Sequence, residues 1–251
     1  MLRRRHCVLG ICLAWAVASA RADLIVDYIH DAGGSSSAPL NGLAARATFR
    51  VDGTEFSILL ENTSAGVPDG FEVSDSLLVS IGLNLPEGVW IAQGNAAVIG
   101  PGSMGLGSWS SRTAGDSVGE QWIWTNDFGG DLMEGYAQVI STSAGQGGGT
   151  ATRFDGGSGT VGGPFGGIAA NPPLLQVPGG QPAASNAIWF DLTLNAALSE
   201  AELVTVAHGS IVEFGSDARY LVPAPEPGSL FALLLGIAVV PRRWQRAAPA
   251  A

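Results

Sequence analysis

The sequence predicts an all-β fold, an antiparallel β-sandwich of jelly-roll type, with an N-terminal signal peptide and one short C-terminal hydrophobic helix. Short runs alternate apolar and polar side chains, as half-buried strands do, and glycine or proline separates these runs. Helical patterns are scarce. Ser199 and Glu202 have the spacing of a capping box, but no long helical period follows, so only a short turn is expected there.

A β-hairpin is predicted around Asp52-Gly53. This dipeptide favours a two-residue turn in which both residues have positive φ, and the flanking residues alternate in polarity. A turn at these two residues places Arg50 opposite Glu55 and Phe49 opposite Phe56. The apolar face of the hairpin is then Ala47, Phe49, Val51, Phe56, Ile58 and Leu60.

Further strands are expected along the body of the chain, residues 23–221. Residues 77–85 place leucine, valine and isoleucine on one side and Ser80 and Gly82 on the other. Residues 144–185 are rich in glycine and proline and predict a long loop. The other predicted strands are residues 89–91, 121–125, 136–141, 188–194, 203–207, 211–214 and 220–222.

The first 22 residues have the layout of a secretory signal peptide. Three arginines at positions 3–5 precede an apolar run at residues 8–18, and small residues then offer cleavage sites of the A-x-A type. Cleavage after Ala22 is favoured, which makes Asp23 the first mature residue, with Arg21 as the alternative start.

A second signal occupies residues 222–251. The triplet Pro225-Glu226-Pro227 is kept extended by its prolines, and a hydrophobic helix is predicted at about residues 228–241. The apolar stretch spans only about 20 Å, against about 30 Å for the hydrocarbon core of a membrane, so we expect a transient membrane helix. A buried core helix or a frayed tail is the alternative. A basic cluster, which the positive-inside rule holds in the cytoplasm, closes the chain: Arg242, Arg243 and Arg246.

This order of triplet, apolar run and terminal arginines resembles the PEP-CTERM sorting signal of exported proteins in Gram-negative bacteria. In that family an exosortase recognises the triplet and removes the tail. The resemblance covers about the last tenth of the chain. It implies transient contact with the exosortase, the export machinery and the inner membrane, and then delivery to the cell surface or the extracellular matrix. An exopolysaccharide is a further expected partner.

The charge of the expected mature chain is strongly negative. Residues 23–226 carry 22 acidic residues and five arginines, a formal charge of −17, and the chain contains no lysine. Such a surface repels nucleic acid and anionic lipid, so neither is expected as a partner of the body. Both cysteines lie within the first 22 residues, so the mature protein is expected to have no disulfide and no cysteine metal ligand.

Catalytic patterns are weak, and we predict a non-catalytic protein without a cofactor or metal. His30 and His208 have no metal-ligand partner at suitable spacing. Carboxylates for glycoside hydrolysis would be sought near the tryptophans of residues 121–125, although a solvated strand edge is the favoured interpretation. Those carboxylates belong to Glu120, Asp127, Asp131 and Glu134.

Two tryptophans offer an alternative function. Trp122 and Trp124 share one face of a predicted strand, so they form a sugar-stacking platform if that face is exposed and part of the core if it is buried. Trp189 alternates with Phe190 and is expected on the outer face of its strand. The predicted role is structural or adhesive at the cell surface, with a carbohydrate-binding module as the first alternative and a secreted hydrolase as the second.

Overall fold

The computed structural model describes residues 23–31, 41–127, 135–144, 150–161, 166–215 and 219–224. The predicted signal peptide, including Ala22, lies outside these residues, as does the tail from Pro225 with its triplet and basic cluster. The predictions made for those two segments therefore stay predictions.

The described residues form fifteen strands, one α-helix and one short 3-10 helix. The helices are η1 (Ser74–Ser76) and α1 (Glu200–His208). The strands are β1 (Leu24–Asp31), β2 (Ala45–Asp52), β3 (Glu55–Asn62), β4 (Leu78–Leu83), β5 (Ile91–Ile99), β6 (Gly105–Gly107), β7 (Trp122–Thr125), β8 (Gln138–Ala144), β9 (Thr150–Arg153), β10 (Ser158–Val161), β11 (Gly167–Ala169), β12 (Pro182–Ser185), β13 (Ala187–Leu194), β14 (Ile211–Phe214) and β15 (Arg219–Pro223).

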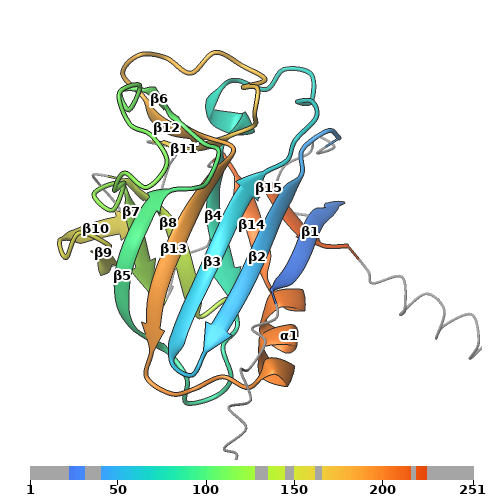
Figure 1. Cartoon of the computed structure of the whole chain (residues 1–251). Coiled ribbons are helices and arrows are strands. Elements are labelled where there is room, and N and C mark those ends of the chain that lie inside the picture. Colours follow the sequence, from blue (N-terminus) through green and yellow to red (C-terminus); the bar gives the residue numbers. More distant parts are fainter. Residues whose placement is uncertain are drawn as a thin grey trace, which may run out of the picture.

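The strands belong to one curled sheet. Its main path runs β10-β9-β7-β8-β4-β14-β15-β1-β2-β3-β13-β5, and β6, β11 and β12 attach at one end of the molecule (Figure 1). All pairings are antiparallel except that of β11 with β12. The all-β, antiparallel prediction is confirmed. Two separate sheets, as in a sandwich, are not confirmed, because hydrogen bonds through β15 join the front strands to those behind.

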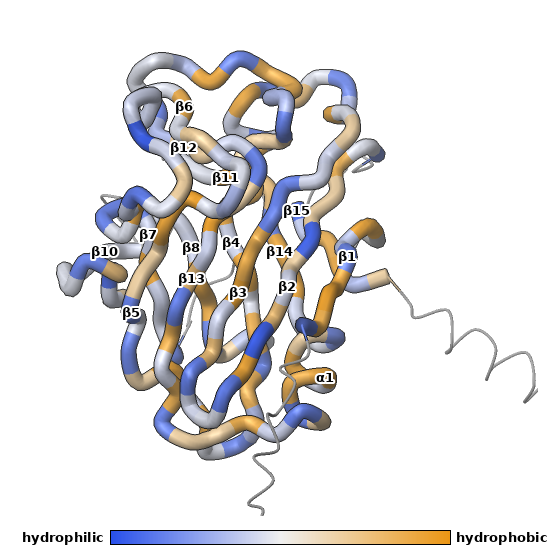
Figure 2. Tube along the Cα trace, in the orientation of Figure 1, coloured by the Kyte–Doolittle hydropathy of each residue, from blue (hydrophilic) through white to orange (hydrophobic). Residues whose placement is uncertain are grey.

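The curl encloses the main hydrophobic core. Strands β5, β13, β3, β2 and β1 form the front in Figure 1, and polar residues are interspersed with apolar ones along them (Figure 2). Apolar side chains of this front such as Phe49, Phe56 and Phe190 point inward, whereas Ile25 and Ile29 of β1 are exposed. Trp122 of β7, behind, meets Phe190 of β13 edge-on, with 4.9 Å between ring centroids. This contact fixes how closely the two parts of the sheet approach across the core.

The β2–β3 hairpin has the predicted faces but not the predicted register. Asp52 pairs with Glu55 and Arg50 with Ser57, so the turn residues are Gly53 and Thr54. Only Gly53 has a positive φ, 62°, which suits a turn that needs it at its first position. The predicted pairings of Arg50 with Glu55 and of Phe49 with Phe56 are therefore wrong, because each partner lies two residues further along β3 and Phe49 pairs with Ile58. A displacement of two residues leaves the faces unchanged, so the predicted apolar set still points into the core.

Strand β4 is buried on both sides. Ser80 and Gly82 face away from Ile81 and Leu83, as predicted, but Leu77 and Val79, expected on the side of Ile81, pack in a separate cluster. All six residues of the strand are buried. The Ser80 hydroxyl is hydrogen-bonded to that of Ser141, 2.7 Å away on β8. The hydroxyl pair satisfies polar groups that would otherwise be costly to bury.

Two predictions about the second half of the chain are wrong. Residues 203–207, expected as a strand, lie in α1. Residues 144–185, expected as a loop, contain the short strands β9, β10, β11 and β12. The helix forms because Ser199 and Glu202 make both bonds of a capping box. The short strands consist largely of small residues, which carry no clear alternation.

The capping box predicts a measurable loss on mutation. Ser199→Ala removes the hydroxyl that accepts from the Glu202 backbone N–H, 3.3 Å away, so it should lower the free energy of unfolding by about 1 kcal/mol. Denaturant unfolding followed by circular dichroism measures this. Ser110→Ala, at an exposed turn position, is the matched control and should change stability by less than about 0.5 kcal/mol. Equal effects would mean that the cap contributes nothing.

Candidate functional site

The outer face of the front strands brings together residues that are far apart in sequence. Phe190 and Leu192 of β13 point into the core, so the residues that alternate with them, Trp189 and Asp191, point outward. Ser57 of β3 lies between Asp191 of β13 and Arg50 of β2, because it pairs with both residues.

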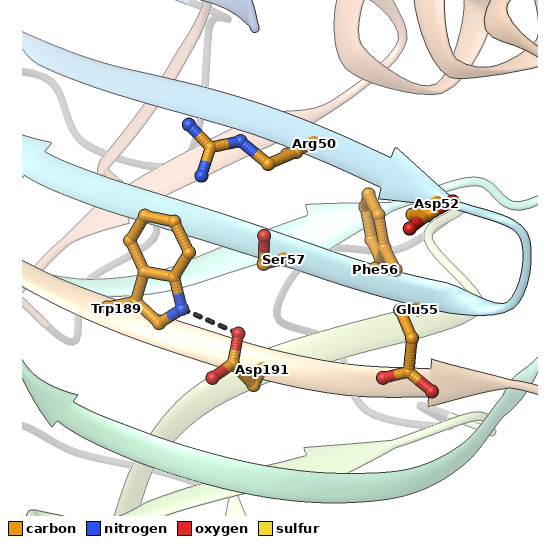
Figure 3. Close-up of a pocket in the computed structure, with 7 residues that line it drawn as sticks. All are labelled: Arg50, Asp52, Glu55, Phe56, Ser57, Trp189 and Asp191. Carbon is orange, nitrogen blue, oxygen red and sulfur yellow. Dashed lines mark hydrogen bonds between the residues drawn. The ribbon is translucent and has the colours of Figure 1, made fainter. Parts of the chain in front are cut away.

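A groove of about 230 Å³ opens on this face, between β2, β3 and β13 (Figure 3). The buried Phe56 contributes to its wall, and its polar lining is largely acidic. Besides Phe56, the groove is lined by Arg50, Asp52, Glu55, Ser57, Trp189 and Asp191.

The Trp189 side chain is half-buried and contacts two polar side chains, Asp191 and Arg50. Its Nε1 donates a hydrogen bond of 2.6 Å to Asp191 Oδ1, as Figure 3 shows. The Arg50 guanidinium carbon lies 5.4 Å from the centroid of the indole ring, within range of a cation–π contact. The indole is therefore fixed in position on the groove wall.

Arg50 is anchored by Asp23, the predicted first residue of the mature chain. Its Nε and Nη2 donate to the two carboxylate oxygens of Asp23, each at 2.7 Å. These hydrogen bonds lower the pKa of Asp23 below 3.8 and raise that of Arg50. Because a lowered carboxyl pKa extends the ionised range downward, the pair is lost only as the pH falls through that lowered pKa. The predicted first mature residue thus lies beside the groove.

The tryptophans predicted as a sugar-stacking platform lie elsewhere. Trp122 is 0% exposed. Trp124 is partly buried and packs against the core over Gly94, where an added Cβ would lie only 2.4 Å from Trp124 Nε1. The exposed face that such a platform requires is absent at Trp122, so these indoles act as core residues.

The carboxylates considered for a hydrolase do not gather into a site. Glu120 forms an ion pair of 2.6 Å with Arg112, and Asp127 is exposed at the end of β7. Asp131 and Glu134 lie outside the described residues.

The remaining features to place are the two histidines, any group of metal-ligating side chains, and any helix long enough to cross a membrane. His208 is half-buried at the end of α1, and the side chain of His30 is not described. Within the described ranges, no three His, Cys, Asp or Glu side chains are grouped so as to hold a metal ion. The helices in that part of the chain are too short or too polar to span a bilayer.

The sequence predicted the outward direction of two groove residues. Alternation with Phe190 predicted an outward Trp189, and the hairpin pattern predicted an outward Arg50. Their meeting depends on the pairing of β3 with β13, strands more than a hundred residues apart, and no local signal specifies that pairing.

Comparison with known proteins identifies no relative of this chain. No model of a known protein family matches the chain, no curated protein is significantly similar to it in sequence, and no solved structure is significantly similar to its fold.

Proposed function

We propose that this protein is exported and has a non-catalytic, adhesive role at the cell surface or in the extracellular matrix. The observation that carries the adhesive role is the open groove on the outer face of the front strands. Trp189 and Arg50 supply it with an apolar and a cationic group that are already fixed in place. Preformed surfaces of this kind bind ligands without a large ordering cost.

The route to the surface is proposed from the terminal segments. A signal peptide cleaved after Ala22 starts the mature chain at Asp23, and the ordered sheet begins at the next residue, Leu24. At the other end, β15 finishes at Pro223, two residues before the Pro225-Glu226-Pro227 triplet. Both proposed processing points therefore lie within a few residues, along the chain, of the first and last described strands.

We also propose that the fold belongs with jelly-roll-like β-sandwiches. The support is the contact of front and back strands across one core, through Trp122 and Phe190. In such a fold, β15 connects the two layers, because it is hydrogen-bonded to β14 on one side and to β1 on the other.

Carbohydrate binding is the second candidate function, favoured by the groove at Trp189. An aromatic ring beside carboxylates suits a sugar, whose C–H faces are apolar and whose hydroxyls donate hydrogen bonds.

The sorting proposal predicts complete retention of a triplet variant. In the native host, replacing Pro225, Glu226 and Pro227 together with alanine should leave the protein uncleaved in the inner membrane, because the processing enzyme no longer recognises it. Fractionation followed by intact-mass measurement should give a wild-type surface protein that begins at Asp23 and lacks Arg246. Cells carrying the triplet variant should also attach less well to one another and to surfaces.

Glu87→Ala, an exposed substitution in the body, is the control and should be processed like the wild type. A wild-type surface protein that still contains Arg246 would contradict removal of the tail. Retention of Met1 would contradict export by a cleaved signal peptide.

A further inference from the structure

Trp189 is restrained from two sides before any ligand arrives. Asp191 accepts the hydrogen bond from its Nε1, and Arg50, itself held by Asp23, lies over its ring. A side chain restrained in this way loses little rotamer entropy when a ligand packs against it. The part of the indole that lines the groove is thus a preorganised apolar surface.

Hydrogen-bonding groups surround this apolar surface. Asp191 and Glu55 provide carboxylate oxygens, which accept hydrogen bonds, and the Ser57 hydroxyl both donates and accepts. A sugar ring has the complementary pattern, with apolar C–H groups on its faces and hydroxyl donors around its rim. The chemistry of the groove therefore favours a sugar over a purely apolar ligand.

The charge of the groove restricts which sugars fit. Three carboxylates and one guanidinium line it, and the guanidinium is already paired with Asp23. The net field at the groove is negative, like that of the whole mature body. A glycan bearing carboxylate, sulfate or phosphate is repelled, whereas an uncharged or ammonium-bearing glycan is not.

A second tryptophan lies further along the same region of the sheet. Trp90, just before β5, is 48% exposed. Its backbone N–H donates to Asn195 Oδ1 at 2.7 Å, and the Asn195 N–H donates to the Trp90 carbonyl at 3.1 Å. The next residue, Ile91, is bonded through both its N–H and its carbonyl to the Asn126 side chain. The exposed indole thus projects from a rigid backbone.

Asn195 follows β13 and continues the outward positions that start at Trp189. The two residues are six positions apart, about 20 Å along an extended strand. Asp191 and Thr193 lie between them, and Asn95 Nδ2 donates to Thr193 Oγ1 at 2.9 Å. Two tryptophans therefore mark the ends of a polar strip, which we call the β13 strip, that is much longer than a single sugar ring.

We infer that the β13 strip, from Trp189 to Trp90, binds a linear glycan of uncharged or amino-bearing sugars. The chain lies along β13, with one sugar against Trp189 in the groove, a later sugar against Trp90, and hydroxyls bonded to the polar groups between them. This inference rests on the proposed adhesive function and names its ligand.

Calorimetric titration of the mature protein tests this. The probes are β-1,4-linked oligomers of glucose, glucosamine and mannuronic acid, each of two and six units. At least one of the glucose and glucosamine hexamers should bind at least tenfold more tightly than its dimer, and the acidic oligomers should not bind. Raising the salt concentration should weaken binding of the glucosamine hexamer, because screening reduces its attraction to the carboxylates.

Variants separate the two ends of the β13 strip. Trp189→Ala should weaken dimer and hexamer binding at least tenfold, and Trp189→Phe should restore part of it. Trp90→Ala should weaken hexamer binding alone. Met104→Ala, an exposed substitution 58% accessible and next to β6, is the control and should change neither affinity. Thermal unfolding of each variant distinguishes a lost site from a lost fold.

Three outcomes overturn the inference: no probe binds, the acidic oligomers bind most tightly, or Trp189→Ala binds like the wild type. A Trp90→Ala variant that keeps full hexamer affinity overturns the extended strip. None of these outcomes affects the proposed export and sorting, which depend on the fractionation result. A mature protein that binds glycans but keeps its tail in the inner membrane contradicts the sorting proposal alone.

Discussion

Phe56→Ala should lower the free energy of unfolding by about 3–5 kcal/mol, the usual cost of removing a buried phenylalanine. The side chain is 1% exposed and stacks on Phe49, with ring centroids 6.3 Å apart and planes 13° from parallel. Its loss leaves a cavity in the core beneath β2 and β3, and the paired strands cannot move in far enough to fill it. Urea unfolding at equilibrium measures the loss.

The matched control is the neighbouring Glu55→Ala, since Glu55 is exposed on the opposite face of the same strand. It should change stability by no more than about 0.5 kcal/mol. Similar losses for the two variants would show that the assigned faces of the hairpin are incorrect.

Gly107→Ala should cost about 2–5 kcal/mol, from two effects that add. The glycine has φ +59°, a conformation that costs an alanine roughly 1–2 kcal/mol. An added Cβ would also lie 1.8 Å from the Gln181 carbonyl oxygen and 2.7 Å from that of Pro178. Both are backbone atoms, which must move apart at a further cost of about 1–3 kcal/mol.

Gly102→Ala shows the first effect, the cost of the positive φ, without the second. Gly102 has a similar φ, +70°, but no atom lies within 4 Å of the position of an added Cβ. This variant should therefore lose only about 1–2 kcal/mol. Equal losses at the two positions, measured by the same urea titration, would mean that the chain at Pro178 and Gln181 yields freely. The close approach of β6 to the segment before β12 would then contribute no stability.

Local signals were sufficient for the faces of strands but not for their partners. The alternation around Phe49 and Phe56 identified the core face correctly, because side-chain direction has a strict period of two. The predicted register was wrong because Asp52-Gly53 and Gly53-Thr54 can both form a two-residue turn. The local sequence does not specify which of the two turns fits the pairing of the other strands. The segment at Leu203–Ala207 reads as a strand by its β-branched residues, yet the capping box at Ser199 made it a helix.

The candidate site shows the same division. An outward Trp189 could be deduced from its neighbour Phe190, whereas the platform at Trp122 and Trp124 could not be judged without knowing what covers that strand. Arg50 was expected beside Glu55 and instead bonds to Asp23, because β1 pairs with β2. Residues 24–31 were not predicted as a strand, so no partner for Arg50 was expected from that segment.

The position of β15 has a consequence for the order of folding. In the described part of the chain, this last strand lies between β14 and β1, and β1 is the first strand. A chain that crosses a membrane from its N-terminus releases β1 first, but β1 can gain its second neighbour only after residue 223 has emerged. Contacts between residues so far apart close slowly, because the loop entropy must be overcome before they contribute. If the chain is exported as we propose, one edge of β1 therefore stays unpaired until almost the whole body has left the translocation channel.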